Sequence, residues 1–338
     1  MKKSFCVFCG FLCFLLVSCG TAEKKAPAKK ERPQAVESAD EGEDDAKKDG
    51  IEDSGIHNLP NGDRYIGGFK DHKKFGEGEY IYANGDRYKG NFENGRYNGN
   101  GELTLKNGTV YTGEFKNGLR HGQGTLVFKS GDRYEGSFVD DRMEGEGVFR
   151  FADEREYRGT YLKNMRHGHG VMIFPSGAEY EGDFDGDKRS GHGKMKYRNG
   201  SVYEGSFVDG KREGTGKLTK ANGEVYEGSF KKDMPNGTGK YTYRNGDVYE
   251  GHMQDGKMTG KGKKTTKSGV YTGEFVDGTY HGIGKFTGSD GAVRYGVWHK
   301  GALANQLPVP EEEDGEESEA ANGSDSEEDS EDSEDIEE

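Results

Sequence analysis

The sequence has few of the residues from which ordinary hydrophobic cores are built. Isoleucine, leucine, valine and phenylalanine make up less than a fifth of the 338 residues, and there is one tryptophan. Mean hydropathy is −1.03 and the formal net charge is −14, which on composition alone is typical of a disordered chain. Glycine is abundant instead, at 57 residues, and the 19 tyrosines and 18 phenylalanines are too many for wholly disordered sequence. The aromatic residues must therefore serve a periodic structure.

The first residues have the pattern of an export signal. Lys2 and Lys3 precede an apolar run over 5–17, which is shorter than the about 20 residues that a bilayer span requires. The run ends in Leu-Val-Ser-Cys at 16–19, which resembles the lipobox of bacterial lipoproteins. In that family the chain is cut before the cysteine, whose thiol and new amino group are then acylated. A plain secretory peptide and a membrane-embedded start are the alternatives.

The lipobox resemblance implies a signal peptide at 1–18 and a lipidated Cys19. The membrane attached through Cys19 would then be that of a bacterial cell envelope, with the chain on its periplasmic side or outer surface. Cysteine is scarce, and the other three, Cys6, Cys9 and Cys13, would be discarded with the signal peptide. A single remaining cysteine excludes a disulfide framework.

Charge separates the chain into a body and two arms. Residues 19–58 lack aromatics and are rich in charge, which predicts a flexible tether carrying the lipid. Residues 302–338 form the other arm, and 311–338 hold 17 acidic and no basic side chains, which predicts a disordered acidic tail. Residues 59–310 contain 39 basic and 34 acidic side chains, a net charge of +5. This mildly basic body has the charge to attract anionic partners or its own tail.

The body repeats itself every 23 residues. Tyrosines followed by x-G-x-(F/Y/M) recur with eight steps of 23 and a last step of 22, and G-x-G follows each tyrosine by eleven residues. The signature tyrosines are Tyr65, Tyr88, Tyr111, Tyr134, Tyr157, Tyr180, Tyr203, Tyr226, Tyr249 and Tyr271. The glycines two residues later are Gly67, Gly90, Gly113, Gly136, Gly159, Gly182, Gly205, Gly228, Gly251 and Gly273. A fixed period of this length is the mark of a repeat array.

Each repeat is predicted to be a β-hairpin. Side chains alternate along a strand, so Tyr134, Gly136 and Phe138 share one face, as do Gly145 and Gly147 on the returning strand. Asn-Gly and Asp-Gly pairs between these segments readily adopt the positive φ that hairpin turns require. We expect the glycines to leave slots in which rings lie against backbone. The array over 59–301 is therefore expected to be all-β: an elongated, twisted, single-layer antiparallel meander of about eleven hairpins, about 100 Å long.

These residues resemble the MORN repeat (membrane occupation and recognition nexus), whose copies run Y-x-G-x-(F/W)-x-x-G and then G-x-G. The resemblance covers 59–301 and implies a β-ribbon that binds proteins, self-associates or lies near membranes. The tyrosines and glycines then form a structural signature and not a catalytic set.

Departures from the repeat are expected to mark weak points. Asp141 and Asn164 stand where a turn glycine is usual, and Met253 replaces an aromatic residue. The C-terminal repeats depart most, which predicts a looser end. Arg294 occupies a tyrosine position in a degenerate eleventh copy near Trp298, and this copy is expected to cap the array.

No pattern in the sequence predicts an enzyme or a cofactor site. A phosphate loop needs a strand, one glycine loop and a following helix, whereas here G-x-G recurs ten times with no helical periodicity after it. His167, His169 and His192 could suggest a metal, but His169 and His192 are expected to lie two strands, about 10 Å, apart. We expect no nucleic-acid partner and no small-molecule substrate either.

The sequence therefore predicts a non-enzymatic, lipid-anchored scaffold or protein-binding module of the cell envelope. The aromatic face, or the alternating polar face, would present an extended binding surface to another protein or to a second copy. An exposed part of the aromatic stripe is expected to drive homodimerisation. The alternative is binding of anionic lipid or polysaccharide by the basic body.

Overall fold

The computed structural model describes residues 55–310. The predicted signal peptide, Cys19, most of the tether and the acidic segment 311–338 lie outside the described residues. The expected all-β fold is confirmed, because residues 55–310 form 23 strands of one open antiparallel sheet and contain no helix. The chain divides into two compact units, one up to Lys257 and one from Met258.

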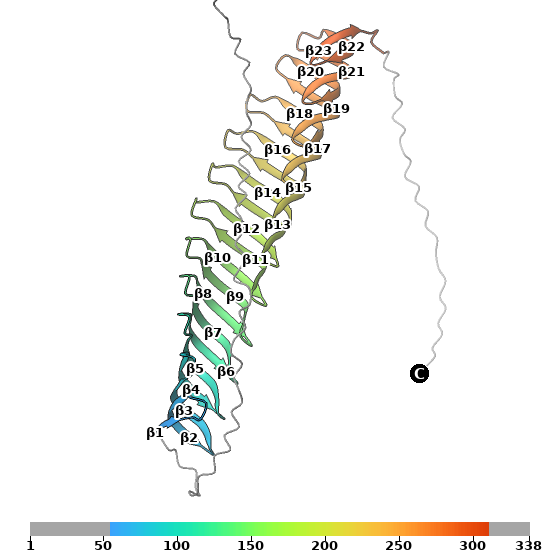
Figure 1. Cartoon of the computed structure of the whole chain (residues 1–338). Helices are drawn as coiled ribbons and strands as arrows, with labels where there is room; N and C mark the ends of the chain where they lie inside the picture. The colour runs from blue at the N-terminus through green and yellow to red at the C-terminus, as the bar shows by residue number, and fades with distance from the viewer. Residues whose placement is uncertain (1–54, 311–338) are drawn as a thin grey trace, which may run out of the picture. The chain divides into compact units, whose positions relative to one another are not determined.

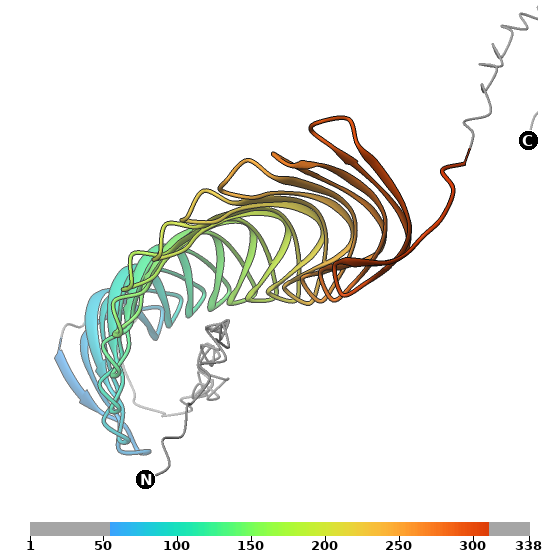
Figure 2. The same cartoon turned by 90° about the horizontal axis from the view of Figure 1, so that it is seen from above.

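The first unit is a meander in which each strand pairs with its neighbours in the sequence (Figure 1). Its strands are β1 (Gly55–Asn58), β2 (Arg64–Lys70), β3 (Lys73–Ile81), β4 (Arg87–Glu93), β5 (Arg96–Thr104), β6 (Val110–Lys116), β7 (Leu119–Val127), β8 (Arg133–Val139), β9 (Arg142–Arg150), β10 (Glu156–Leu162), β11 (Met165–Ile173), β12 (Glu179–Asp185), β13 (Lys188–Lys196), β14 (Val202–Val208), β15 (Lys211–Thr219), β16 (Val225–Lys231), β17 (Met234–Thr242) and β18 (Val248–Gln254). In this unit the strands are arched and successive hairpins lie one behind another (Figure 2).

The second unit continues the same pattern in five strands. They are β19 (Lys257–Thr266), β20 (Gly269–Val276), β21 (Thr279–Gly288), β22 (Val293–His299) and β23 (Ala302–Gln306). β19 pairs antiparallel with β20, β20 with β21, β21 with β22, and β22 with β23.

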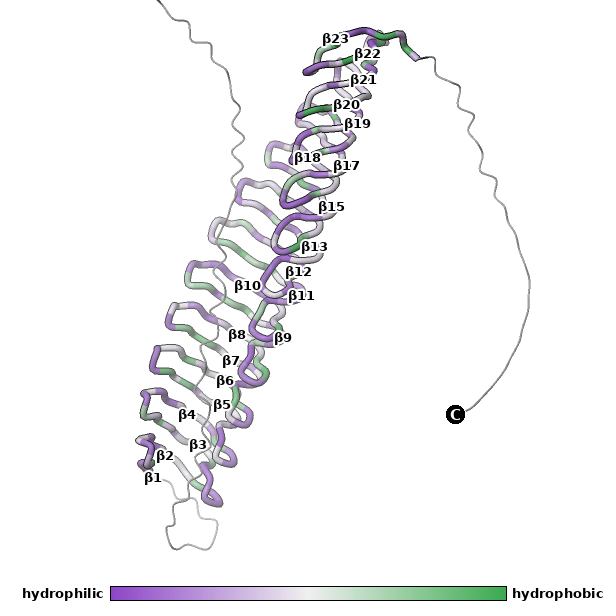
Figure 3. The backbone as a smooth tube through the Cα atoms, turned by 45° about the vertical axis from the view of Figure 1, so that its right-hand side comes forward, coloured by the Kyte–Doolittle hydropathy of each residue, from purple (hydrophilic) through white to green (hydrophobic). Residues whose placement is uncertain are grey.

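The turns between repeats are held by the residues that the sequence pattern singled out. At 82–86, Tyr82 and Asp86 pair through their backbones, and the Gly85 N–H donates to the Tyr82 carbonyl at 2.9 Å. The Asn84 side chain accepts a hydrogen bond from the Asp86 N–H at 2.8 Å. Such turns are hydrophilic, as the tube of Figure 3 shows along the first unit. Asparagine closes the turn with its side chain while glycine adopts a positive φ, which explains the recurring Asn-Gly pair.

The hairpins from β2–β3 to β16–β17 each contain a β-bulge that breaks the simple alternation of the second strand. Gly136 pairs with Gly147, but Phe138 pairs with Met143, so Ser137 stands opposite three residues. Gly145 lies in this bulge with φ 93°, and a side chain there would point at Ser137 on the opposite face. The expectation that Gly145 shares the face of Gly147 is therefore wrong, because the bulge turns it over. Only the second glycine of G-x-G lies beneath a ring.

Candidate functional site

The repeating unit of the array is a tyrosine ring seated on two paired glycines. The ring of Tyr134 lies so close to Gly136 and Gly147 that a Cβ on either would be 2.5 Å from its hydroxyl oxygen. That hydroxyl donates a hydrogen bond to the Ser137 carbonyl at 3.0 Å. The ring filling the slot is thus the repeat's own tyrosine rather than a neighbouring ring.

All ten signature tyrosines are buried and hydrogen-bonded in this way. Each is at most 1% exposed, and each hydroxyl donates to the carbonyl oxygen three residues further on. Burial raises the pKa of Tyr203 to about 12, against a nearby Arg212 that acts in the opposite direction. These tyrosines are therefore neutral hydrogen-bond donors at physiological pH, with no free hydroxyl for chemistry.

Ring contacts join each repeat to the next. Tyr111 meets Phe115 of its own strand edge-to-face at a centroid distance of 5.1 Å. It meets Phe138 of the following repeat in the same geometry at 5.0 Å. This alternation continues from Tyr65 to Phe230 within the first unit, and such pairs add stability beyond the area that they bury. Adjacent repeats are thereby fixed to one another.

Four arginines cover this aromatic row, and the sequence analysis missed them. The Arg120 guanidinium lies 5.7 Å from the centroid of Tyr111 and 5.4 Å from that of Phe138. Its Nη2 donates to the Asp141 carbonyl of the next hairpin at 2.7 Å. The same arrangement recurs at Arg166, Arg189 and Arg212. The signal was present, because arginine stands two residues before the first glycine of G-x-G in these repeats.

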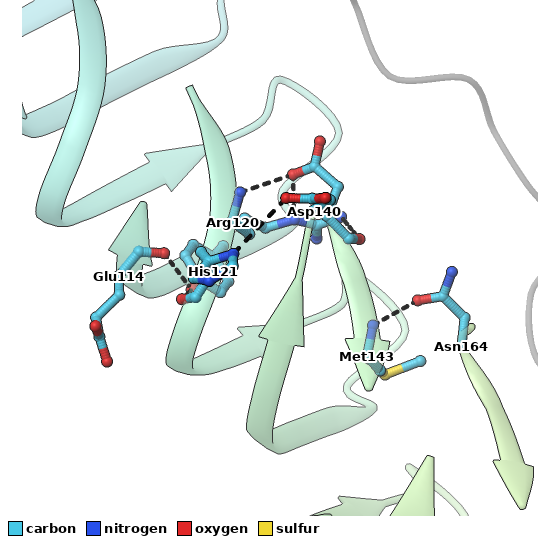
Figure 4. Close-up of polar contacts among 8 residues, drawn as sticks. Glu114, Arg120, His121, Asp140, Met143 and Asn164 are labelled. Carbon is cyan, nitrogen blue, oxygen red and sulfur yellow. Dashed lines mark hydrogen bonds and ion pairs between the residues drawn. The ribbon is translucent and has the colours of Figure 1, made fainter. Parts of the chain in front are cut away.

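The departures at the hairpin turns strengthen contacts between hairpins and are not weak points. Asp141 has φ 67°, and its Oδ1 accepts from the Arg120 backbone N–H at 2.9 Å and from its Nε at 3.1 Å. Asn164 has φ 68° and accepts from the Met143 N–H at 2.8 Å. Figure 4 shows Asn164 reaching Met143 across the two hairpins. Aspartate and asparagine tolerate the left-handed backbone and add a side-chain acceptor that glycine lacks. The expectation of weakness at Asp141 and Asn164 is therefore wrong.

The aromatic stripe is closed within the array. Phe138 and Phe207 are less than 2% exposed, and Phe92, Phe115, Phe184 and Phe230 are 2–4% exposed. These six phenylalanines therefore offer no exposed surface to a second copy. The ring surfaces are covered by glycine backbone, by neighbouring rings and by arginine side chains.

The opposite face of the first unit is polar and accessible. Cross-strand ion pairs recur there at one position of three successive repeats, namely Lys194–Glu204, Lys217–Glu227 and Lys240–Glu250, with N–O distances of 3.4, 2.5 and 3.2 Å. A groove of about 710 Å³ runs over β13–β16, and the first two of these pairs line it. Its lining includes His192, Thr215 and Thr219. The geometry suits an extended polar ligand that makes several hydrogen bonds and ion pairs.

The histidines of this face pair with aspartates. His169 Nδ1 lies 3.6 Å from Asp183, and His167 Nδ1 lies 3.4 Å from Asp185. Over residues 55–310, no group of three or more His, Cys, Asp or Glu is placed to hold a metal ion. Among the same residues, none forms a helix long and apolar enough to cross a membrane.

The last hairpin of the second unit differs from the others as its sequence suggested. Arg294, in the tyrosine position, is exposed, whereas Trp298, in the phenylalanine position, is 6% exposed. The Trp298 ring meets Tyr271 edge-to-face at 5.3 Å, and its Nε1 donates to the Gly284 carbonyl at 2.9 Å. Trp298 thus packs against the tyrosine of the preceding repeat and hydrogen-bonds to its backbone.

An open antiparallel sheet with one ring-and-glycine unit per 23 residues defines an all-β repeat protein. The sequence matches the MORN repeat over ten segments, residues 65–87, 88–110, 111–133, 134–154, 157–179, 180–202, 203–225, 226–248, 249–270 and 271–293. The chain belongs to the MORN repeat family.

Comparisons with other proteins concern the fold alone. No curated protein matches this sequence. Among solved structures, the TCP10 domain of Danio rerio CPAP in complex with a peptide of Danio rerio STIL is 12% identical, with a TM-score of 0.36 over 72% of this chain and 97% of that chain. The TCP10c domain of Drosophila melanogaster Sas-4 is 13% identical, with a TM-score of 0.28 over 54% of this chain and 100% of that chain.

Proposed function

We propose that this chain is a non-enzymatic, lipid-anchored scaffold of the bacterial cell envelope that binds a protein partner through its polar face. The observation that carries the proposal is that the two faces of the first unit differ in accessibility. Its aromatic face is closed by internal contacts, while its polar face presents the same ion pairs repeat after repeat and the 710 Å³ groove. An extended surface of repeated polar groups is how solenoid-like arrays bind protein partners.

Membrane attachment in this proposal comes from Cys19 and not from the repeats. Acyl chains on this cysteine anchor the chain, since multiple lipids hold far better than one. Replacing Cys19 with alanine is expected to release the protein from the membrane fraction of intact bacteria. Cys13→Ala is the matched control, because Cys13 would leave with the signal peptide. Release of both variants, or of neither, would contradict the lipoprotein assignment.

The polar face is tested by site-specific photocrosslinking in intact cells. A photoreactive residue at Thr215, in the groove, is expected to capture a discrete partner, which is another protein or a second copy. The same residue at Asn222, in an exposed turn, is the control. Equal capture at both positions would contradict binding through the polar face.

The second candidate, binding of anionic lipid or polysaccharide by the basic body, is favoured by the net charge of +5 over 59–310. Flotation of the Cys19→Ala protein with anionic vesicles separates the two functions. Salt-sensitive flotation would support the second candidate, and its absence would leave protein binding.

A further inference from the structure

We propose that the acidic segment 311–338 of this chain binds the lysine-bearing polar face of its second unit, formed by β19, β20 and β21. The proposal does not depend on the scaffold function. It combines the location of positive charge, a change in the repeat pattern, and the length and starting point of the acidic segment.

Positive charge is concentrated in the second unit. Residues 55–257 contain 32 lysines and arginines against 31 acidic residues, a net charge of +1. Residues 258–310 contain 7 against 3, a net charge of +4 in a much shorter stretch. Most of the excess positive charge of the body is therefore in the part of the sequence that directly precedes the 17 acidic residues of 311–338.

The repeat pattern shows where this excess arises. In three successive repeats of the first unit, a lysine faces a glutamate across the polar face, as with Lys240 and Glu250. The next repeat keeps the lysine, as Lys263, but the residue opposite it on β20 is Thr272. In the repeat after that the lysine is Lys285, and the residue opposite it on β22 is Tyr295. The lysine position is thus retained in both repeats, whereas its register partner on the next strand is not an acidic residue.

These lysines gather in one place. Thr272 is the register partner of Lys263 on one side and of Lys285 on the other, so the two lysines stand about 10 Å apart. Lys261 lies on the same face of β19, two residues from Lys263, and both are exposed. On the polar face of β19–β21 as the structure describes it, the single carboxylate is Glu274, opposite Lys261. The face therefore carries a net positive charge.

The acidic segment begins within easy reach of this face. β19 is four strands from β23 in the sheet, about 19 Å at the usual strand spacing. β23 ends at Gln306, and the acidic segment starts five residues later. Its 28 residues can extend over roughly 90 Å. Because both partners belong to one chain, the effective concentration is on the order of millimolar, which favours even weak contacts.

The expected interaction is electrostatic and competitive. Exposed ion pairs are individually weak, so binding requires several lysines together and is screened once the Debye length falls below about 8 Å. An acidic segment held here would compete with any other anionic ligand for the same lysines.

Zero-length carbodiimide crosslinking of the Cys19→Ala chain tests this directly. At low salt we expect crosslinks from 311–338 to concentrate on Lys261, Lys263 and Lys285, and to fall by about fivefold or more at high salt, where screening is strong. Replacing these three lysines with glutamine removes their charge as well as their amines, so crosslinks from 311–338 to another lysine of the second unit, Lys267, should also fall. The matched control replaces Lys194, Lys217 and Lys240, which occupy the polar face of the first unit. This control should leave the crosslinks to the second unit unchanged.

Several results would overturn the proposal. Crosslinks spread evenly over the lysines of both units, or insensitive to salt, would do so. In mixtures of isotopically light and heavy chains, a majority of crosslinks between copies would exclude binding by the chain's own tail. A variant with the acidic residues of 311–338 replaced by amides leaves the folded part untouched. It should raise the reactivity of Lys263 toward an amine reagent by about twofold or more, and unchanged reactivity would refute the contact.

Discussion

The ring of Tyr134 rests against the backbone of Gly147, so closely that a Cβ on that glycine would stand 2.5 Å from the tyrosine hydroxyl oxygen. Gly147 has no positive φ, so the space beneath the ring, rather than the backbone conformation, demands glycine here. The same relationship recurs in the other signature repeats, as with Tyr180 and Gly193. The array is thus built on contacts between rings and backbone.

Gly147→Ala is therefore expected to destabilise the array by about 1–3 kcal/mol, the usual cost of overpacking a tight site. The comparison is Gly177→Ala, where φ is 80° but a Cβ meets nothing within 4 Å, so only backbone strain of about 1 kcal/mol is incurred. Urea unfolding followed by circular dichroism measures both. Equal losses for the two variants would mean that the ring is not seated as described.

Asp141 is expected to stabilise the junction between two hairpins through its carboxylate. Asp141→Asn keeps the acceptor that Asn164 uses at the equivalent position, and so should be nearly neutral. Asp141→Ala removes the acceptor and places alanine at φ 67°, which should cost about 1–3 kcal/mol. Hydrogen exchange of the Arg120 amide reports the loss locally. An alanine variant as well protected there as the asparagine variant would contradict this role.

Alkaline pH is expected to unfold the array cooperatively. Burial raises the pKa of Tyr65, Tyr203, Tyr226, Tyr249 and Tyr271 to about 12, above the value near 10 of an unfolded tyrosine. A raised folded pKa gives stability that is complete below pH 10 and is lost as the pH rises from about 10 through 12. Tyrosinate absorbance should rise together with the loss of β-sheet signal. Full ionisation near pH 10 with an intact sheet would contradict the burial of these hydroxyls.

Trp298 is expected to hold the last repeats of the second unit together. Trp298→Ala removes its ring contacts with Tyr271 and Tyr280 and should cost about 3–5 kcal/mol. Because repeats stabilise mainly their neighbours, hydrogen exchange should lose protection over β20–β23 but retain it over β6–β13. Trp298→Phe keeps a ring in the position and should retain most protection. Uniform loss along the whole chain would show that the array unfolds as one unit.

The strand and turn pattern could be predicted from the sequence because the same arrangement of aromatic residues, glycines and turn residues recurs in ten repeats. The 23-residue spacing of the tyrosines and the Asn-Gly pairs specify hairpins through local rules of alternation and turn chemistry. The bulge at Gly145 escaped prediction because it interrupts that alternation without any change of residue type. The register of Phe138 with Met143, not the sequence spacing, reveals it.

The accessible surface was harder to predict than the fold. Aromatic residues in a single-layer sheet suggested an exposed stripe, yet glycine lets Tyr134 lie against the backbone while Phe138 and neighbouring rings seal its edges. The arginines that cover the rings, such as Arg120, act between repeats, so their partners are not visible within one 23-residue copy. The distinction between the two faces depends on these contacts.

Pairing of the strands of the first unit with their sequence neighbours has a consequence for how such a chain can vary. Removing residues 157–179 would join Glu156 to Tyr180, and Tyr134 would then meet Phe184 in place of Tyr161 with every turn type preserved. Deletions or duplications of whole repeats therefore change the number of hairpins without creating a new kind of contact. A shift of one residue within a repeat would instead displace a tyrosine from its glycines. Length is the property that this architecture leaves free to change, in steps of 23 residues.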